Sequence, residues 1–321
     1  MAERTRKTHS GTGALQAGRV KKHSVWRLAG KQWRLFVMVA PAVILLFIFN
    51  YLPMAGIQIA FKDYDFGKGI WGSPWAGTKY FSYLFQPDFW NIFKNTLVIA
   101  LLKFVTGFPA PIILALMINH VRRKRFKRLV QTAVYLPHFL SWVVVAGLLQ
   151  SILALEGGLF NSIGALFGGE PTHYLGEKGL FYPIVILSSL WKGTGWGTIM
   201  YLAAMSGIDP ELYEAAMIDG ASEFKQIRHI TLPSLIPMIS ILLVLSMPGL
   251  ISAGFDQIYL LQNAYNLGIS EVIETYVLRL GLMNAQFSYT TAIGLFTSVT
   301  GTVLLLLSNT LSRKMGGEGI W

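Results

Sequence analysis

The chain has 321 residues, of which 53% are hydrophobic and only 13% are charged, and its mean hydropathy is +0.49. A soluble domain carries about 25% charged residues, and so much apolar surface cannot be enclosed in one soluble core, whereas lipid can solvate it. The net charge of +11 does not indicate nucleic-acid binding, because the basic residues cluster beside apolar segments and form no soluble basic face. The chain contains no cysteine, which excludes disulfides and thiolate metal sites.

Six apolar segments are long enough to cross a membrane, which takes roughly 20 residues for each span. They cover residues 35–61, 91–119, 131–155, 181–204, 234–255 and 290–311. Each is expected to be helical, because lipid offers no partner to unpaired backbone groups. The second and fourth are weaker as spans, since they contain lysines together with prolines or glycines. No short apolar core with a small-residue cleavage site follows the basic residues 1–34, so we interpret the first segment as a retained span. The sequence therefore predicts an all-α, polytopic bundle of six transmembrane helices.

The distribution of Lys and Arg predicts the orientation, because basic residues favour the cytoplasmic side of a membrane. The larger group comprises Arg4, Arg6, Lys7, Arg19, Lys21, Lys22, Arg27, Lys31, Arg34, Arg122, Arg123, Lys124, Arg125, Lys127, Arg128, Lys225, Arg228, Arg313 and Lys314. The smaller group, on the opposite side, comprises Lys62, Lys68, Lys79, Lys178 and Arg279. Both termini are therefore expected in the cytoplasm. The chain then divides into a basic N-terminal segment (1–34), a transmembrane domain (35–312) with a long cytoplasmic loop (206–233), and a C-terminal tail (313–321).

The loop between the fourth and fifth spans differs from the other connections. Asp209 and Pro210 form a helix start, with a capping carboxylate followed by a proline at the first helical position. Gly220 is suited to end this helix with a positive φ. A second helix is expected over residues 222–229, with Ser222 as its cap, before the fifth span begins. Joining two spans takes only a few residues, so a projecting helix–turn–helix indicates a surface for another protein.

The first helix of this loop carries a motif. Ala215 and Ala216 let another protein approach the backbone, and Glu214 beside them is able to pair with a basic residue of that protein. The motif residues are Glu214, Ala215, Ala216, Gly220, Ile230, Leu232 and Pro233. Their spacing is Glu-Ala-Ala, three residues, Gly, nine residues, Ile, one residue, Leu-Pro. In this the chain resembles the membrane subunits of binding-protein-dependent ATP-binding-cassette (ABC) importers, whose EAA motif has this spacing. We call residues 206–233 the coupling loop, and the resemblance implies that its first helix sits in a groove of an ATPase subunit.

The resemblance covers residues 33–321 and points to one branch of the family. Residues 108–111, 135–142 and 316–321 are similar to the polysaccharide and oligosaccharide branch, which includes the alginate importer's permeases and resembles the maltose type. It implies a type I importer permease fold in the bacterial inner membrane, surrounded by lipid. The implied partners are a second homologous permease, two ATPase subunits, an extracytoplasmic binding protein and an oligosaccharide substrate. ATP and Mg are implied to bind to the ATPase subunits, so no cofactor is expected in this chain and it is not itself an enzyme.

Residues at membrane depth supply candidates for the substrate path, because polar side chains there usually face a cavity or a partner. The candidates are Lys103, Trp191, Lys192, Trp196, Asp256 and Gln257. The three glycines within 193–197 of the fourth span have two interpretations. In one, they loosen the helix beside a cavity, where the tryptophans stack on sugars. In the other, they permit tight helix packing while Lys192 snorkels or pairs internally. For Asp256 and Gln257, the polar end of a helix is the favoured alternative. The two lysines motivate the hypothesis of an acidic oligosaccharide, such as a uronate.

Three other classes of membrane protein fit the residues less well. A gradient-driven carrier needs intramembrane carboxylates, and none of the six segments holds an Asp or Glu well inside it. An intramembrane serine hydrolase needs a nucleophile elbow, and residues 204–207 lack its first glycine; the histidines have no zinc-type partners at helical spacing. A channel has no need of the projecting loop. The glycines at 13 and 18 have phosphate-loop spacing, but Arg19 follows in place of lysine.

The C-terminal residues 316–321 combine glycines with a terminal tryptophan. Two interpretations are open: the tail reaches the ATPase dimer and regulates it, or it packs against its own bundle.

Overall fold

The computed structural model describes residues 33–314. The chain divides into two compact units, residues 1–55 and 56–321. The described residues are helical apart from turns and one isolated antiparallel bridge between Lys62 and Trp75. The predicted all-α fold class is thereby confirmed. The interpretations of the basic N-terminal segment before Trp33 and of the glycine-rich tail concern residues outside the described part.

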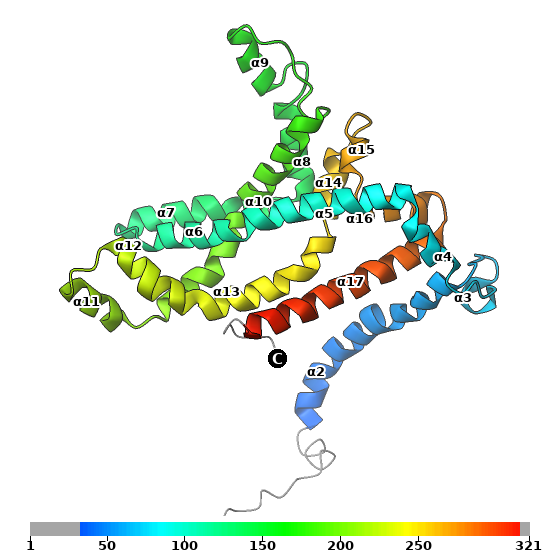
Figure 1. Cartoon of the computed structure of the whole chain (residues 1–321), viewed down its shortest axis with the longest axis horizontal. Helices are drawn as coiled ribbons and strands as arrows, with labels where there is room; N and C mark the ends of the chain where they lie inside the picture. The colour runs from blue at the N-terminus through cyan, green and yellow to red at the C-terminus, as the bar shows by residue number, and fades with distance from the viewer. Residues whose placement is uncertain (1–32, 315–321) are drawn as a thin grey trace, which may run out of the picture. The chain divides into compact units, whose positions relative to one another are not determined.

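The first span is an apolar helix of 29 residues, Trp33–Phe61. It consists of α2 (Trp33–Leu46), a π-helical turn η1 (Phe47–Tyr51) and a 3-10 helix η2 (Leu52–Phe61). Figure 1 shows α2 in blue. None of the residues of α2 and η1 is buried, as expected for side chains that face lipid.

Three further helices of the described residues are long and apolar enough to cross a membrane. They are Pro87–Asn119, formed by α5 (Pro87–Gly107) and α6 (Pro109–Asn119); Glu223–Ile251, which contains α13 (Leu232–Ser246) and η6 (Met247–Ile251); and Phe287–Lys314, which is α17. The fifth span thus ends four residues before its predicted end. The helix is interrupted there by three non-helical residues, Ser252 to Gly254. Ser252 is extended, and Gly254 has a φ of +86°. The predicted number of six spans stays a prediction.

The third predicted span is not one straight helix. It consists of α7 (Lys124–Tyr135), η4 (Leu136–Phe139) and α8 (Trp142–Ile152), and the chain bends by 97° between Phe139 and Trp142. Pro137 lies at the start of η4, where its ring removes a backbone donor and favours a bend. Ser141 then caps α8, accepting a hydrogen bond from the amide of Val144. Pro137 therefore lies directly before the bend.

The fourth predicted span lies within α10 (Lys178–Ser206), a continuous helix of 29 residues that packs against α5, α6, α7 and α13. A Cβ atom at Gly195 would lie 1.9 Å from the carbonyl oxygen of Val134 in α7, and one at Gly197 would lie 2.8 Å from Pro111 in α6. These two glycines therefore permit close helix packing. Gly193 has no heavy atom within 4 Å of such a position, so the tight-packing interpretation holds for two of the three glycines.

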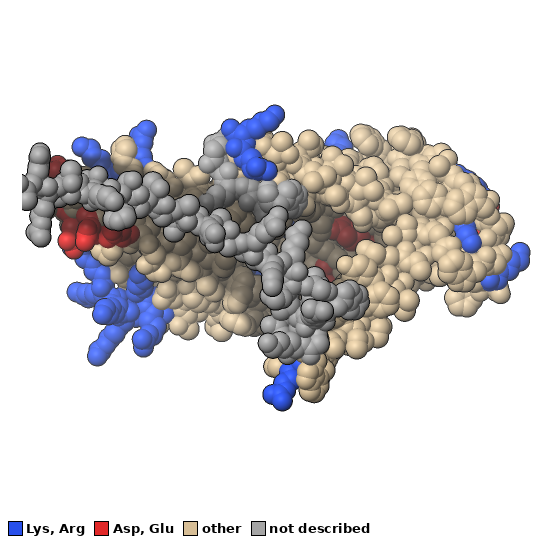
Figure 2. Space-filling model, turned by 90° about the horizontal axis from the view of Figure 1, so that it is seen from below, with Lys and Arg blue, Asp and Glu red and all other residues tan. Residues whose placement is uncertain are grey.

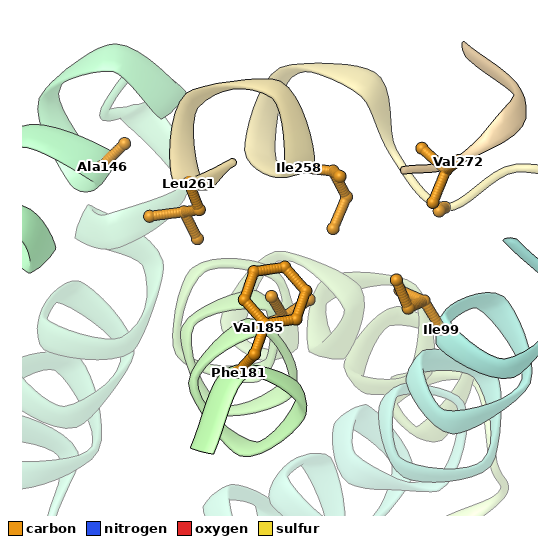
Figure 3. Close-up of a cluster of buried hydrophobic side chains, with 8 residues drawn as sticks. Ile99, Ala146, Phe181, Val185, Ile258, Leu261 and Val272 are labelled. Atoms are coloured by element: carbon orange, nitrogen blue, oxygen red, sulfur yellow. The ribbon is translucent and has the colours of Figure 1, made fainter. Parts of the chain in front are cut away.

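A cluster of buried apolar side chains joins four helices and the residue before a fifth. Ile99 of α5, Ala146 of α8 and Phe181 of α10 meet Ile258 of α14 (Phe255–Leu261) and Val272, which directly precedes α16 (Ile273–Leu278). In Figure 3, Ile258 and Val272 lie above Phe181 and Ile99, which come from separate helices. The hydrophobic side chains of the segment that follows the break at Ser252 are therefore held by the bundle.

The remaining connections contain short helices. They are α3 (Gly69–Gly72), α4 (Lys79–Ser82), η3 (Tyr83–Phe85), α9 (Leu159–Leu166), α15 (Leu267–Ser270) and the π-helical η7 (Arg279–Met283) on the predicted outer side, and α11 (Pro210–Ile218), α12 (Glu223–Gln226) and η5 (Ile227–Thr231) in the coupling loop. Figure 2 shows Lys and Arg side chains gathered at the end of the molecule where α7 and α12 lie in Figure 1. This arrangement agrees with the predicted orientation.

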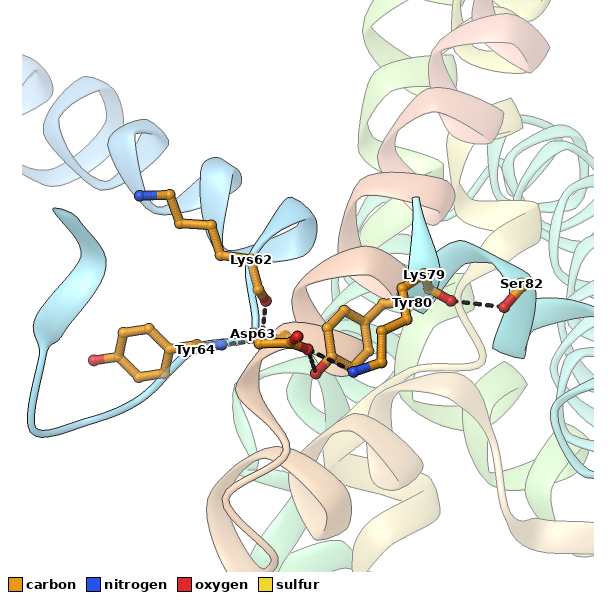
Figure 4. Close-up of polar contacts among 7 residues, drawn as sticks. Lys62, Asp63, Tyr64, Lys79, Tyr80 and Ser82 are labelled. Atoms are coloured by element: carbon orange, nitrogen blue, oxygen red, sulfur yellow. Dashed lines mark hydrogen bonds and ion pairs between the residues drawn. The ribbon is translucent and has the colours of Figure 1, made fainter. Parts of the chain in front are cut away.

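The first outer connection is anchored by a polar cluster around Asp63 (Figure 4). The ammonium of Lys79 and the hydroxyl of Tyr80 donate hydrogen bonds of 2.7 and 2.6 Å to Oδ1 of Asp63. The hydroxyl of Ser288 in α17 donates to the carbonyl oxygen of Lys62 at 2.6 Å. The Lys79 ammonium holds the pKa of the Asp63 carboxyl below its usual value of 3.8, and Tyr80 acts in the same direction.

Candidate functional site

The first helix of the coupling loop forms as the sequence predicts. Oδ1 of Asp209 accepts a hydrogen bond of 3.0 Å from the amide of Glu211, and α11 begins at Pro210. Gly220 ends the turn after this helix with a φ of +72°, which confirms the expected positive φ. Glu214 and Ala215 are exposed, and Ala216 is half-buried. The exposed surface of α11 is apolar as well as charged, since Ile218 is 86% exposed. A solvated loop has no need of such a surface, whereas a docking helix does.

The second half of the loop differs from the prediction. Ser222 has extended backbone geometry, but its side chain makes no capping hydrogen bond. The expected helix over 222–229 does not end before the fifth span. Instead, α12 continues through the π-helical η5 into α13, and Glu223–Ile251 is one helical run of 29 residues. Pro233 lies inside this run, just after the π-helical η5, and local π adjustments satisfy the backbone groups that a proline frees in a membrane helix. The second half of the coupling loop is therefore an extension of the fifth span.

Two contacts that the sequence did not reveal join this extension to α11 and to the loop before α7. The hydroxyl of Tyr213 lies 2.9 Å from Oγ1 of the buried Thr231. Arg122, in the loop before α7, forms an ion pair of 2.9 Å with Glu223 at the start of α12. This pair is solvent-exposed and contributes little stability by itself. Of the motif residues, Ile230 and Leu232 are half-buried on this extension.

Lys192 is held by the bend of the third span. Its Nζ donates a hydrogen bond of 2.8 Å to the carbonyl oxygen of His138 and lies 5.6 Å from the ring centre of Trp142. The ring of Trp196 stacks on the ring of His138, with centres 4.5 Å apart. Trp191 faces another side of α10, where it lines an apolar groove of about 510 Å³ between α8 and α10. The structure thus separates the two tryptophans and ties Lys192 to the backbone.

Lys103 lies beside the break in the fifth span. Its Nζ donates a hydrogen bond of 2.6 Å to the carbonyl oxygen of Ala253. On α5 it also lines a polar cavity of about 190 Å³ together with Thr106, Ser189 and Thr194. We call this space the α5–α10 cavity.

Asp256 and Gln257 separate in the structure. Asp256 is exposed in the first turn of α14. Gln257 is buried, and its Nε2 donates to the carbonyl oxygen of Val185 at 2.7 Å and to the hydroxyl of Ser188 at 2.8 Å. The side chain of Gln257 therefore joins α14 to α10, a packing role that the helix-end alternative did not include.

Sequence reasoning missed Glu274, because it lies in a connection that we placed outside the spans. Its Oε1 accepts hydrogen bonds from the hydroxyl of Ser252 at 2.6 Å and from the amide of Ala253 at 3.0 Å. Its Oε2 is buried and has no hydrogen-bond partner among the described residues. Glu274 and Ser252 line a cleft of about 390 Å³ with Thr297 and Ser298 of α17; we call it the α17 cleft. Acidic side chains are visible in a hollow of the apolar middle part of the molecule in Figure 2. Three Asp, Glu or His side chains that converge as a metal site requires do not occur within residues 33–314.

The helical architecture, the apolar spans and the projecting loop together define a multi-pass membrane protein of the transport class. The family described as "Binding-protein-dependent transport system inner membrane component" matches residues 107–317. The chain belongs to this family and is an inner-membrane permease component. It is 45% identical to the polygalacturonan/rhamnogalacturonan transport system permease YteP of Bacillus subtilis over 96% of this chain and 97% of that protein. It is 28% identical to the arabinooligosaccharide transport system permease AraP of the same organism, over 93% of this chain and 95% of that one.

Solved structures extend these similarities. A chain of a bacterial ABC transporter involved in the import of the acidic polysaccharide alginate superposes with a TM-score of 0.84 and 40% identity, covering 90% of this chain and 98% of that one. A chain of the alginate transporter in complex with a periplasmic protein that carries an alginate pentasaccharide superposes with a TM-score of 0.85 and 39% identity, covering 93% and 100%. The fold of the described residues is thus the fold of an ABC importer permease.

Proposed function

We propose that this chain and a second, homologous permease form the membrane-spanning part of an oligosaccharide importer, and that two ATPase subunits drive it through the coupling loop. The observation that carries the proposal is the shape of this loop. Its first helix exposes Glu214 and Ala215 at the surface, while its second helix continues without interruption into the fifth span. The full spacing of the EAA motif supports the same role.

The continuous helix provides a mechanism for coupling. When the ATPase dimer closes on ATP and Mg, it displaces α11. Because the chain is helical from Glu223 to Ile251, the displacement passes along the fifth span to the break at Ser252. The chain supplies part of the path and one coupling loop, and it performs no covalent chemistry.

The substrate class that we propose is an acidic oligosaccharide, delivered by an extracytoplasmic binding protein. Relatives named for polygalacturonan and alginate, whose sugars carry carboxylates, support this class. Lys103 and Lys192 place two positive charges inside the bundle. Each ammonium group has three donors and spends one on a backbone carbonyl, so donors remain for a uronate carboxylate.

The test of coupling is co-purification of an ATPase with the detergent-solubilised chain. We expect Glu214→Lys and Gly220→Pro to abolish co-purification, because the first reverses the charge on the docking face and the second removes the positive φ that ends α11. Glu170→Lys, an equal charge change at an exposed residue on the predicted outer side, serves as the control. If no ATPase accompanies the well-folded native chain, the importer is refuted, and a gradient-driven carrier or a channel becomes the better account.

The test of the substrate class is ATPase stimulation of the reconstituted complex with its binding protein. Oligogalacturonides are compared with neutral oligosaccharides of equal length. We expect stimulation by the acidic sugars to fall after Lys192→Gln or Lys103→Gln. Equal stimulation by neutral sugars, or unchanged stimulation in both variants, contradicts the acidic class while leaving the coupling mechanism intact.

A further inference from the structure

The break in the fifth span is held from two sides by oppositely charged residues. On one side, the ammonium of Lys103 donates to the carbonyl oxygen of Ala253. On the other side, the carboxylate of Glu274 accepts from the amide of the same residue and from the hydroxyl of Ser252. Extended backbone leaves its polar groups unpaired, and at membrane depth neither water nor lipid replaces the missing partners cheaply. The two side chains therefore satisfy both polar groups of Ala253.

Each of the two charged residues lines a different space with polar side chains on its wall. Lys103 lines the α5–α10 cavity with Thr106, Ser189 and Thr194. Glu274 lines the α17 cleft with Thr297 and other residues of α17. Ala253 hydrogen-bonds to both residues, so the break and its two partners lie between the cavity and the cleft.

Other contacts hold the neighbouring segments in place without these charges. Asn95 of α5 donates to the carbonyl oxygens of Gly268 and Glu271, both at 3.1 Å. The hydroxyl of Thr96 accepts from the amide of Ile273 at 2.9 Å. Helix α5 is thus tied to the segment that bears Glu274, whether or not Lys103 reaches Ala253. These contacts involve neither Ala253 nor the side chains of Lys103 and Glu274, so the charged pair has a role separate from tying α5 to this segment.

We propose that Lys103 and Glu274 are positioning residues of the transport path that hold Ala253 as a partition between the α5–α10 cavity and the α17 cleft. When the fifth span moves, both charged groups release Ala253 and the two polar spaces join into one path. The pair acts as a unit, because removing one charge leaves the other in a poorly solvated site without its counter-charge. This inference rests on the proposed transport function.

Thiol labelling tests the partition directly, since the chain has no cysteine of its own. Single cysteines are placed in the cavity (Thr194→Cys) and in the cleft (Ser298→Cys) of the complete complex in membrane vesicles, and both are labelled with a membrane-impermeant maleimide. We expect the less reactive of the two sites to label at least fivefold faster after Lys103→Met or Glu274→Gln. The double variant, which removes both groups that hold Ala253, is expected to label at least as fast as either single variant. Lys94→Met, an exposed lysine nine residues earlier on α5, is the matched control and is expected to label at the native rate.

Glu274→Gln keeps the size of the side chain and an acceptor oxygen, so it reports even where Lys103→Met fails to accumulate. Native labelling rates in this variant overturn the partition. A Lys103→Arg variant keeps the charge and the donors and is expected to restore a low rate; fast labelling there also contradicts the proposal. The second readout is the ratio of binding-protein-stimulated to unstimulated ATPase activity, which we expect to fall at least threefold in the single variants. An unchanged ratio would exclude a role in transport. If no ATPase is present in the native complex, the proposed importer function is refuted. The labelling rates still test whether Ala253 separates the cavity from the cleft.

Discussion

The close packing of α10 on α7 can be tested by comparing alanine substitutions at two nearby glycines of α10, Gly193 and Gly195. A Cβ atom at Gly195 would lie 1.9 Å from the carbonyl oxygen of Val134 and 2.5 Å from its carbonyl carbon, so the two helices must separate to admit a methyl group. Overfilling a packed site costs about 1–3 kcal/mol. At Gly193 nothing lies within 4 Å of the same position, and replacing a helical glycine with alanine there stabilises by about 0.5–1 kcal/mol. Because this gain applies at both positions, we expect Gly195→Ala to unfold about 1–3 kcal/mol more easily than Gly193→Ala.

The assay is unfolding of the purified chain in detergent, followed by tryptophan fluorescence. Both substitutions add one methyl group to the same helix, so effects of helix propensity cancel in the comparison. Equal stability of the two variants would refute the close approach of α10 to Val134. A more stable Gly195→Ala would favour the alternative interpretation, in which the glycines of this segment loosen the helix.

Three further predictions concern the loops and the bend. Gly220→Ala places a methyl group at a φ of +72°, which costs about 1–2 kcal/mol. We therefore expect less ATPase to co-purify with this variant. The control, Gly207→Ala, lies at a φ of −90° and is expected to leave co-purification unchanged. Because Lys79 lowers the pKa of Asp63 below 3.8, the anchoring is present above this value and lost as the pH falls through the lower folded pKa. Proteolysis of the first outer connection is thus expected to be constant from pH 8 to 5 and faster only below about pH 4; acceleration near pH 6 argues against this anchor. Lys192→Met removes the donor to the bend, and we expect lower thermal stability that Lys192→Arg restores; equal loss in both variants means that the hydrogen bond is not the cause.

Much of the architecture was readable from local patterns. Apolar length predicted helices, because a chain in lipid has to satisfy its backbone internally, and the structure confirms an all-helical fold. Asp209, Pro210 and Gly220 predicted the first helix of the coupling loop, because capping and positive-φ turns depend on nearby residues. The prediction for the second helix was wrong at its end, since the π-helical turn after Gln226 keeps the backbone helical through Pro233.

For the candidate substrate path, the sequence predicted individual residues but not their contacts. Lys103 and Lys192 stood out as charges within predicted spans, but their partners are backbone carbonyls more than fifty residues away. No sequence pattern predicts which distant backbone carbonyl oxygen accepts a hydrogen bond from a given lysine. Glu274 was placed outside the spans because hydropathy averages over a window, and only the return of the chain through α16 brings it to Ala253.

The sequence by itself determined the class of fold, the coupling loop and its motif, because these follow from composition, helix periodicity and the chemistry of caps and turns. Only the tertiary structure decided that Gly195 packs against Val134, that Gln257 joins two helices, and that Lys103 and Glu274 meet at one residue. The physical reason is that hydrogen bonds and close packing at membrane depth depend on distances between distant segments. Their geometry is set by how the helices pack around a shared core.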